Sequence, residues 1–154
     1  MAPLGEVVVV APDAERSAVG HAITTLTPLR VKEVSLEGGF RGSACNGTPA
    51  DSVKLAVGAL LEQPTDLVVS GINLGPNTAT NIIYSGTVSA ATEARILGIP
   101  SIAISLGGLK NPICENSANY PIRSAAQGPA PGLTPTILLH LDAPILPSAE
   151  VASV

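Results

Sequence analysis

Small polar residues crowd one connection of this chain, between an apolar run that ends near Ser70 and a periodic segment that begins near Thr87. Asn73, Asn77 and the triplet Ser85-Gly86-Thr87 lie in this connection. The first amides of a helix have no partner inside the helix, so these amides and the two hydroxyls of the triplet could hold a phosphate, with Gly86 permitting close approach. A simpler interpretation is that Ser85 and Thr87 only cap the helix, and the residues alone leave both open.

Two further polar residues have the chemistry of ligands for a hard cation. Ser17 and Asn73 offer neutral oxygens, which Mg²⁺ or Mn²⁺ accepts but binds weakly without carboxylates beside them. Either residue taken alone is better explained as a turn former. The two histidines, His21 and His140, lack metal-ligand spacing, and we expect both to be structural.

Several catalytic and nucleotide-binding motifs do not occur in the sequence. Neither GxGxxG nor GxxxxGK[ST] is present, which excludes the fingerprints of dinucleotide-binding and P-loop proteins. GxSxG is absent as well, and no Ser-His-Asp grouping can be picked out.

The elements that must position these residues alternate between strands and helices. The runs Val7–Val10, Leu67–Ser70 and Ser101–Ser105 predict buried strands, the first of them buried on both faces. Thr48-Pro49-Ala50-Asp51 predicts a capping box that opens a helix, and a second helix is expected from about Thr87 to Leu97. The order β-α-β-α-β predicts a doubly wound, mostly parallel sheet.

Weaker signals predict the remaining strands. Extended segments near a sheet edge are expected within His21–Val34, with a short strand at Gly42–Cys45 and one more at Ile137–Leu141. Ligands of such sheets gather outside the carboxyl ends of the strands. We therefore expect Asp13–Ser17, Asn46–Thr48 and Gly71–Thr87 to converge.

Composition narrows the class of protein. The 154 residues fit one domain, and with 45% apolar but only 2% aromatic residues the core must be aliphatic. A net charge of −4 with scattered Lys and Arg argues against nucleic-acid partners, and no apolar run is long enough to span a membrane. With no recognisable signal peptide, we expect a cytoplasmic protein whose Cys45 and Cys114 are free thiols.

The chain divides in two by composition. Half of its 14 prolines lie after Lys110. We expect an α/β domain over residues 1–110, followed by a Pro-rich tail over residues 111–154.

Five segments, in order, resemble the stationary-phase survival protein SurE family: APDAERSAVGHAIT (11–24), NGTPADSV (46–53), SGINLGPN (70–77), YSGTVSAATEA (84–94) and GIPSIAISL (98–106). The resemblance covers roughly residues 6 to 107. It implies a three-layer, Rossmann-like α/β fold, a cytoplasmic homo-oligomer, and a metal-dependent 5'(3')-nucleotidase or phosphatase that acts on nucleoside monophosphates.

The resemblance also assigns roles to residues. It implies that Ser17 and Asn73 bind a divalent metal, Mg²⁺ or Mn²⁺. It implies that Asn77, Ser85, Gly86 and Thr87 form a phosphate pocket, and Asn46, Gly47 and Thr48 extend it toward the substrate.

The chain also departs from the family pattern. That pattern opens with a strand followed by Asn-Asp-Asp-Gly, a motif that this sequence does not contain. We therefore expect the chain to correspond to the fold without its first strand. One alternative is an inactive fragment that keeps the phosphate pocket, and another is a module that acts by packing against a partner.

Overall fold

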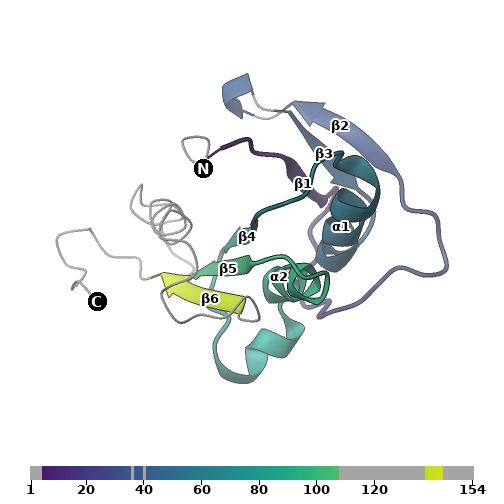
Figure 1. Ribbon diagram of the computed structural model, residues 1–154. Helices are drawn as coiled ribbons and strands as arrows, with labels where there is room; N and C mark the ends of the chain where they lie inside the picture. Colours follow the sequence, from purple (N-terminus) through teal and green to yellow (C-terminus); the bar gives the residue numbers. More distant parts are fainter. Residues whose placement is uncertain (1–4, 36, 40, 108–137, 144–154) are drawn as a thin grey trace.

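The computed structural model describes residues 5–35, 37–39, 41–107 and 138–143. Six strands form two three-stranded sheets (Figure 1). In the first, the order is β1-β3-β2, with β1 (Val9–Pro12) parallel and β2 (Val31–Ser35) antiparallel to the central β3 (Arg41–Cys45). The second has the order β4-β5-β6 and is parallel throughout, with β4 (Val68–Asn73), β5 (Ser101–Leu106) and β6 (Leu138–Ala143).

Two α-helices lie among the described residues. Helix α1 (Pro49–Leu55) follows β3 and runs on into the π-helical turn η3 (Ala56–Leu60). Helix α2 (Gly86–Ile96) follows β4 through the 3₁₀ helix η4 (Ala79–Tyr84), and the short 3₁₀ turn η2 (Glu37–Gly39) joins β2 to β3. Figure 1 shows α1 and α2 side by side, so the two βα units share one helical layer.

The predicted order of elements is confirmed, with boundaries shifted by a few residues. The capping box of Thr48 and Asp51 is present, and Pro49 occupies the first turn of α1. The edge segment lies at β2, and the last expected strand is β6. Most of the expected tail, residues 111–137 and 144–154, lies outside the described residues, as does Cys114.

Two expectations about burial are wrong. Leu67–Ser70 was expected to be a buried strand, yet its residues are only half-buried, because β4 pairs on one side alone among the described residues. The first strand was expected to be buried on both faces, yet Val7 and Val8 are 37% and 51% exposed. In the described part of the chain, β1 pairs only with β3 and no ladder joins it to β4, so the outer edges of β1 and β4 have no strand partner there. The expectation of a fold without its first strand implies such open edges, because the loss of a central strand leaves its neighbours without a partner. Among the described residues the expected single sheet is accordingly two sheets.

The core is aliphatic, as the composition predicts. One cluster joins Val53 of α1 to Ala90, Ala94 and Ile99, and a second joins Val88 and Ala91 of α2 to Ala103 of β5. Alanines on α2 let the helix approach both α1 and the sheet closely. This packing fixes the N-terminus of α2 beside the carboxyl end of β4.

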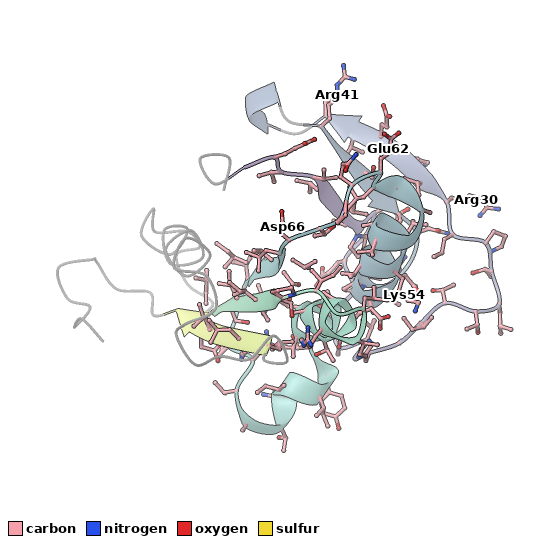
Figure 2. All side chains as sticks on the ribbon, in the orientation of Figure 1. Arg30, Arg41, Lys54, Glu62 and Asp66 are labelled. Carbon is pink, nitrogen blue, oxygen red and sulfur yellow. The ribbon has the colours of Figure 1, made fainter. Side chains whose placement is uncertain are left out.

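Charged side chains lie mostly at the periphery. Figure 2 shows Arg30 and Arg41 directed away from the body of the fold. No helix among the described residues is both long and apolar enough to cross a membrane.

Candidate functional site

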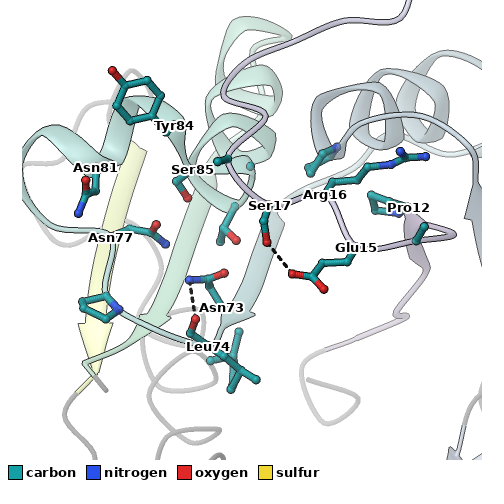
Figure 3. A pocket seen from close by; sticks show the side chains of 17 residues that line it. Pro12, Glu15, Arg16, Ser17, Asn73, Leu74, Asn77, Asn81, Tyr84 and Ser85 are labelled. Atoms are coloured by element: carbon teal, nitrogen blue, oxygen red, sulfur yellow. Dashed lines mark hydrogen bonds between the residues drawn. The ribbon is translucent and has the colours of Figure 1, made fainter. Parts of the chain in front are cut away.

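A cleft of about 730 Å³ lies at the carboxyl ends of β1 and β4. Its walls are the turn after β1, the loop after β4 and the first turn of α2 (Figure 3). All the residues for which a metal or phosphate role is predicted lie along these walls: Ser17, Asn73, Asn77, Ser85, Gly86 and Thr87. The fold thus brings together residues that are as much as 70 positions apart in the sequence (17 to 87).

The N-terminus of α2 opens into this cleft. Ser85 is the N-cap, and its Oγ accepts the amide of Val88 at 3.2 Å. Among the described residues the amides of Gly86 and Thr87 have no partner, and the first turn holds no acidic residue. Ser85 therefore does cap the helix, and the cap leaves two amides and the positive end of the helix dipole for an anion.

Gly86 allows this N-terminus to sit against its neighbours. A Cβ at Gly86 would lie 2.8 Å from Cγ of Pro49, the first residue of α1. It would also lie 3.5 Å from the carbonyl oxygen of Arg16. Any side chain here would push the α2 terminus away from the Ser17 turn.

The segment Asn46–Thr48 has a different place. None of its three residues lines the cleft. Instead, the carbonyls of Asn46 and Gly47 accept hydrogen bonds from the Arg16 guanidinium at 3.0 and 3.2 Å. The segment therefore supports the turn that carries Ser17, and its substrate-binding role stays a prediction.

Thr48 and Asp51 close the N-terminus of α1. The Thr48 side chain accepts the Asp51 amide at 3.1 Å, and the Asp51 carboxylate accepts the amides of Thr48 and Thr24 at 2.9 and 3.0 Å. Burial by itself raises the pKa of Asp51, but these hydrogen bonds outweigh it and hold the pKa below its ordinary value. A carboxylate that is 1% exposed thus occupies the place an anion would need.

Two candidate metal ligands face each other across the cleft. Both amide hydrogens of Asn73 are directed to loop carbonyls, at 2.8 Å to Gly75 and 3.3 Å to Leu74, so Oδ1 is left for the cleft (Figure 3). Ser17 donates to the carboxylate of Glu15 at 2.7 Å. Among the described residues lining the cleft, Glu15 supplies the one carboxylate.

This donor set fits part of the shell of a hard cation. It consists of oxygens only, the ligand type that Mg²⁺ and Mn²⁺ prefer. Within the described ranges, no three His, Cys, Asp or Glu side chains are grouped so as to hold a metal. Ser17 and Asn73 would therefore hold the ion together with water, phosphate oxygens or further carboxylates.

A polar network that the sequence did not predict lies behind Asn77. Asn77 Nδ2 donates to Ser105 Oγ at 2.6 Å, Ser105 Oγ lies 3.3 Å from His140 Nε2, and His140 Nδ1 lies 3.9 Å from Asp142. A Ser-His-Asp grouping therefore exists, contrary to expectation, because β5 and β6 are parallel neighbours. Ser105 is 0% exposed behind Asn77, which excludes it as a nucleophile in this arrangement.

The other histidine is structural, as expected. His21 Nε2 lies 2.7 Å from the Glu93 carboxylate, whose other oxygen accepts Lys54 Nζ at 3.1 Å. Burial alone raises the pKa of Glu93, but its bonds to His21 and Lys54 bring the pKa below its ordinary value. The trio ties the loop after β1 to both helices.

Comparisons with known proteins bear on this site. The sequence model of the family described as Survival protein SurE matches residues 1–154. The chain belongs to the SurE family.

Relatives named 5'-nucleotidase SurE resemble this family member closely. Those of Syntrophobacter fumaroxidans and Thermosynechococcus vestitus are 48% and 51% identical to it over 149 and 151 residues, 97% of this chain in both cases. The crystal structure of the SurE protein from Aquifex aeolicus matches with a TM-score of 0.83 at 43% identity over 97% of this chain. These matches confirm the SurE-type α/β fold.

The chain spans about three fifths of the proteins that it matches. It covers 60% and 57% of the two relatives and 59% of the Aquifex chain.

Proposed function

We propose that this chain carries the phosphate-binding half of a metal-dependent nucleotidase, which hydrolyses nucleoside monophosphates to a nucleoside and inorganic phosphate. The observation that carries the proposal is the convergence of Ser17, Asn73, Asn77 and the α2 N-terminus on one cleft. The family's nucleotidase relatives support the same reaction.

The residues of the cleft would bind two different groups, the phosphoryl oxygens and a metal ion. The Gly86 and Thr87 amides and the Thr87 hydroxyl would bind phosphoryl oxygens, where the helix dipole stabilises the negative charge that develops as water attacks phosphorus. The P–O ester bond breaks, and the leaving nucleoside oxygen takes up a proton. Ser17 and Asn73 would hold a divalent cation, which would supply Lewis acidity toward the phosphoryl group.

Turnover of adenosine monophosphate with and without added Mn²⁺ or Mg²⁺ tests the proposal. We expect metal-dependent release of phosphate that Asn73→Ala abolishes. Asn81→Ala is the matched control, since Asn81 lines the cleft but is assigned no ligand role. Equal turnover by wild type and Asn73→Ala would remove Asn73 from the metal site.

A second candidate is a chain that binds phosphate without turning it over. The single carboxylate among the described lining residues favours it, because neutral oxygens hold a hard dication weakly. It predicts anion binding that is insensitive to Mn²⁺ and absent in Thr87→Trp. Turnover in the presence of metal would exclude it.

We also propose that the chain self-associates. Leu26 and Ile96 are 95% and 68% exposed, and covering such apolar side chains at an interface would favour association. Light scattering of the purified chain tests this, and a monodisperse monomer would contradict it.

A further inference from the structure

Asn77 is held from behind by residues of two strands. Its backbone amide donates to Asp142 Oδ1 at 3.2 Å, and its side-chain nitrogen donates to Ser105 Oγ at 2.6 Å. Ser105 lies 3.3 Å from His140, and His140 lies 3.9 Å from the other oxygen of Asp142. The network thus starts at the cleft and ends at a group that can gain a proton.

The direction of the hydrogen bonds follows from the protonation of His140. A neutral imidazole whose Nε2 is unprotonated accepts a hydrogen bond, so the Ser105 hydroxyl donates to it. The Ser105 oxygen is then free to accept, and the amide nitrogen of Asn77 turns inward to donate. This arrangement leaves Asn77 Oδ1, an acceptor, for the cleft.

Protonation of His140 reverses the direction of the hydrogen bonds along this network. A charged imidazolium donates from both nitrogens, so Nε2 donates to the Ser105 oxygen. The Ser105 hydroxyl is then free to donate toward Asn77, and Asn77 accepts this hydrogen bond when it presents Oδ1 inward. The Asn77 amide nitrogen turns to the cleft, where its hydrogens can bind an anion.

One charged group lies against His140 in the described part of the chain: Asp142, on the same strand. Strand β5 carries no charged residue, and of the two charged residues of α2, Glu93 is paired elsewhere and Arg95 forms no ion pair with the described residues. The His140 side chain is 15% exposed, which leaves a route for solvent protons.

We infer that His140 is a positioning residue: through Ser105 it sets which end of the Asn77 amide faces the cleft. Protonated His140 presents the amide nitrogen to an anion, and neutral His140 presents the oxygen. The benefit for phosphate binding rests on the function proposed above, whereas the coupling between His140 and Asn77 does not.

Nuclear magnetic resonance of the ¹⁵N-labelled, ligand-free chain tests the coupling directly. The side-chain amide signals of Asn77, assigned with Asn77→Asp, are followed from about pH 5 to 8, the range in which histidines commonly titrate. We expect these signals to move together with the ring signals of His140. Asn77 signals that stay constant while the ring signals of His140 move would overturn the inference, and the pH series itself is recorded on the unaltered chain.

Variants and a simple anion extend the test. Sulfate keeps its charge over this pH range, so its binding reports on the protein alone. We expect sulfate to bind about 5- to 10-fold more tightly at pH 5.5 than at pH 7.5. This factor corresponds to the free energy of about one hydrogen bond. His140→Gln and Ser105→Ala should lose this difference, and His21→Gln should keep it.

The outcomes separate the two proposals. An equal gain in sulfate binding at low pH in wild type and His140→Gln would overturn the inference, because the gain would come from the overall charge. Coupled Asn77 and His140 signals without sulfate binding at either pH would support the positioning role and contradict the phosphate site.

Discussion

The two helix N-termini of this molecule meet at Gly86 and Pro49 but are built for different purposes. Both begin with a hydroxyl residue that caps a backbone amide, Thr48 for α1 and Ser85 for α2. Helix α1 adds the buried carboxylate of Asp51, which completes a reciprocal box with Thr48 and also accepts the amide of Thr24. Helix α2 has no acidic residue in its first turn and leaves its amides open to the cleft.

The two termini show that a capping residue alone does not indicate a ligand-binding site. The α2 terminus differs because its first turn holds no acidic side chain, so the positive end of its helix dipole is not neutralised there. At α1, Asp51 supplies that neutralisation from within; under the proposed function, the α1 terminus contributes stability and the α2 terminus contributes anion binding. Substitutions at the two termini should therefore separate stability from binding.

The largest effect is expected from Gly86→Val. The added side chain meets Pro49 and separates the α2 terminus from the Ser17 turn, which removes several anion donors at once. We expect a loss of about 100-fold or more in phosphate-monoester turnover, comparable to the loss of an oxyanion-hole donor.

Gly58→Val is the control for this experiment, since Gly58 has open space around its Cβ position. Turnover is measured for both variants after circular dichroism has established that they fold. Near-normal turnover in Gly86→Val would show that the α2 terminus does not bind the phosphate.

Asp51→Ala should instead reduce stability. It leaves the partly buried amides of Thr24 and Thr48 without an acceptor, and we expect a loss of about 2–3 kcal/mol in the free energy of unfolding. Urea denaturation measures this loss, with the exposed Asp66→Ala as the control. Sulfate affinity of the folded variant should be unchanged, and a parallel loss of affinity would erase the distinction between the two termini.

Acid should destabilise the fold through the same carboxylate. The pKa values of Asp51 and Glu93 are lowered from ordinary values of 3.8 and 4.5, so the unfolded chain binds protons first as the pH falls. Their contribution is fully present above these values and is lost as the pH drops below them toward the lowered pKa of the folded state. Unfolding free energies at pH 7, 5, 4 and 3 should fall mainly below pH 5, and less steeply in Asp51→Ala than in wild type.

The smallest effect is expected from Thr87→Val, which keeps the shape of the side chain and removes one hydroxyl. Sulfate affinity should fall by about 5- to 10-fold with little change in stability, since one hydrogen bond is worth about 1 kcal/mol. Thr92→Val is the matched control, because the Thr92 hydroxyl donates to the helix carbonyl of Val88 at 2.8 Å. An equal loss of affinity in both variants would remove Thr87 from the site.

Much of the local structure could be predicted from the sequence. The capping box at Thr48, the strand at β5 and the helix after Ser85 follow from short-range patterns, because caps and periodicity depend on neighbours in the chain. The convergence of Ser17 with Asn73 also followed, since parallel strands place their carboxyl ends together.

What could not be predicted depends on register and partners. Whether Val7 is covered is decided by the elements packed against the strand and not by the strand's own residues. Ser105 and His140 meet only because β5 and β6 align Ser105 with Asp142, two residues beyond His140. No spacing in the sequence signals that alignment.

The position of Asp142 has a consequence for how the protein is made. The backbone amide of Asn77 donates a hydrogen bond to Asp142, a residue 65 positions further along the chain. During synthesis, which proceeds from the N-terminus, both helices can form on the ribosome while β6 is still inside it. Closing so long a loop comes late and is slow, so the phosphate cradle is completed only after the helices that flank it. A nascent chain that ends before β6 would carry an open α2 terminus without the strand that orients Asn77.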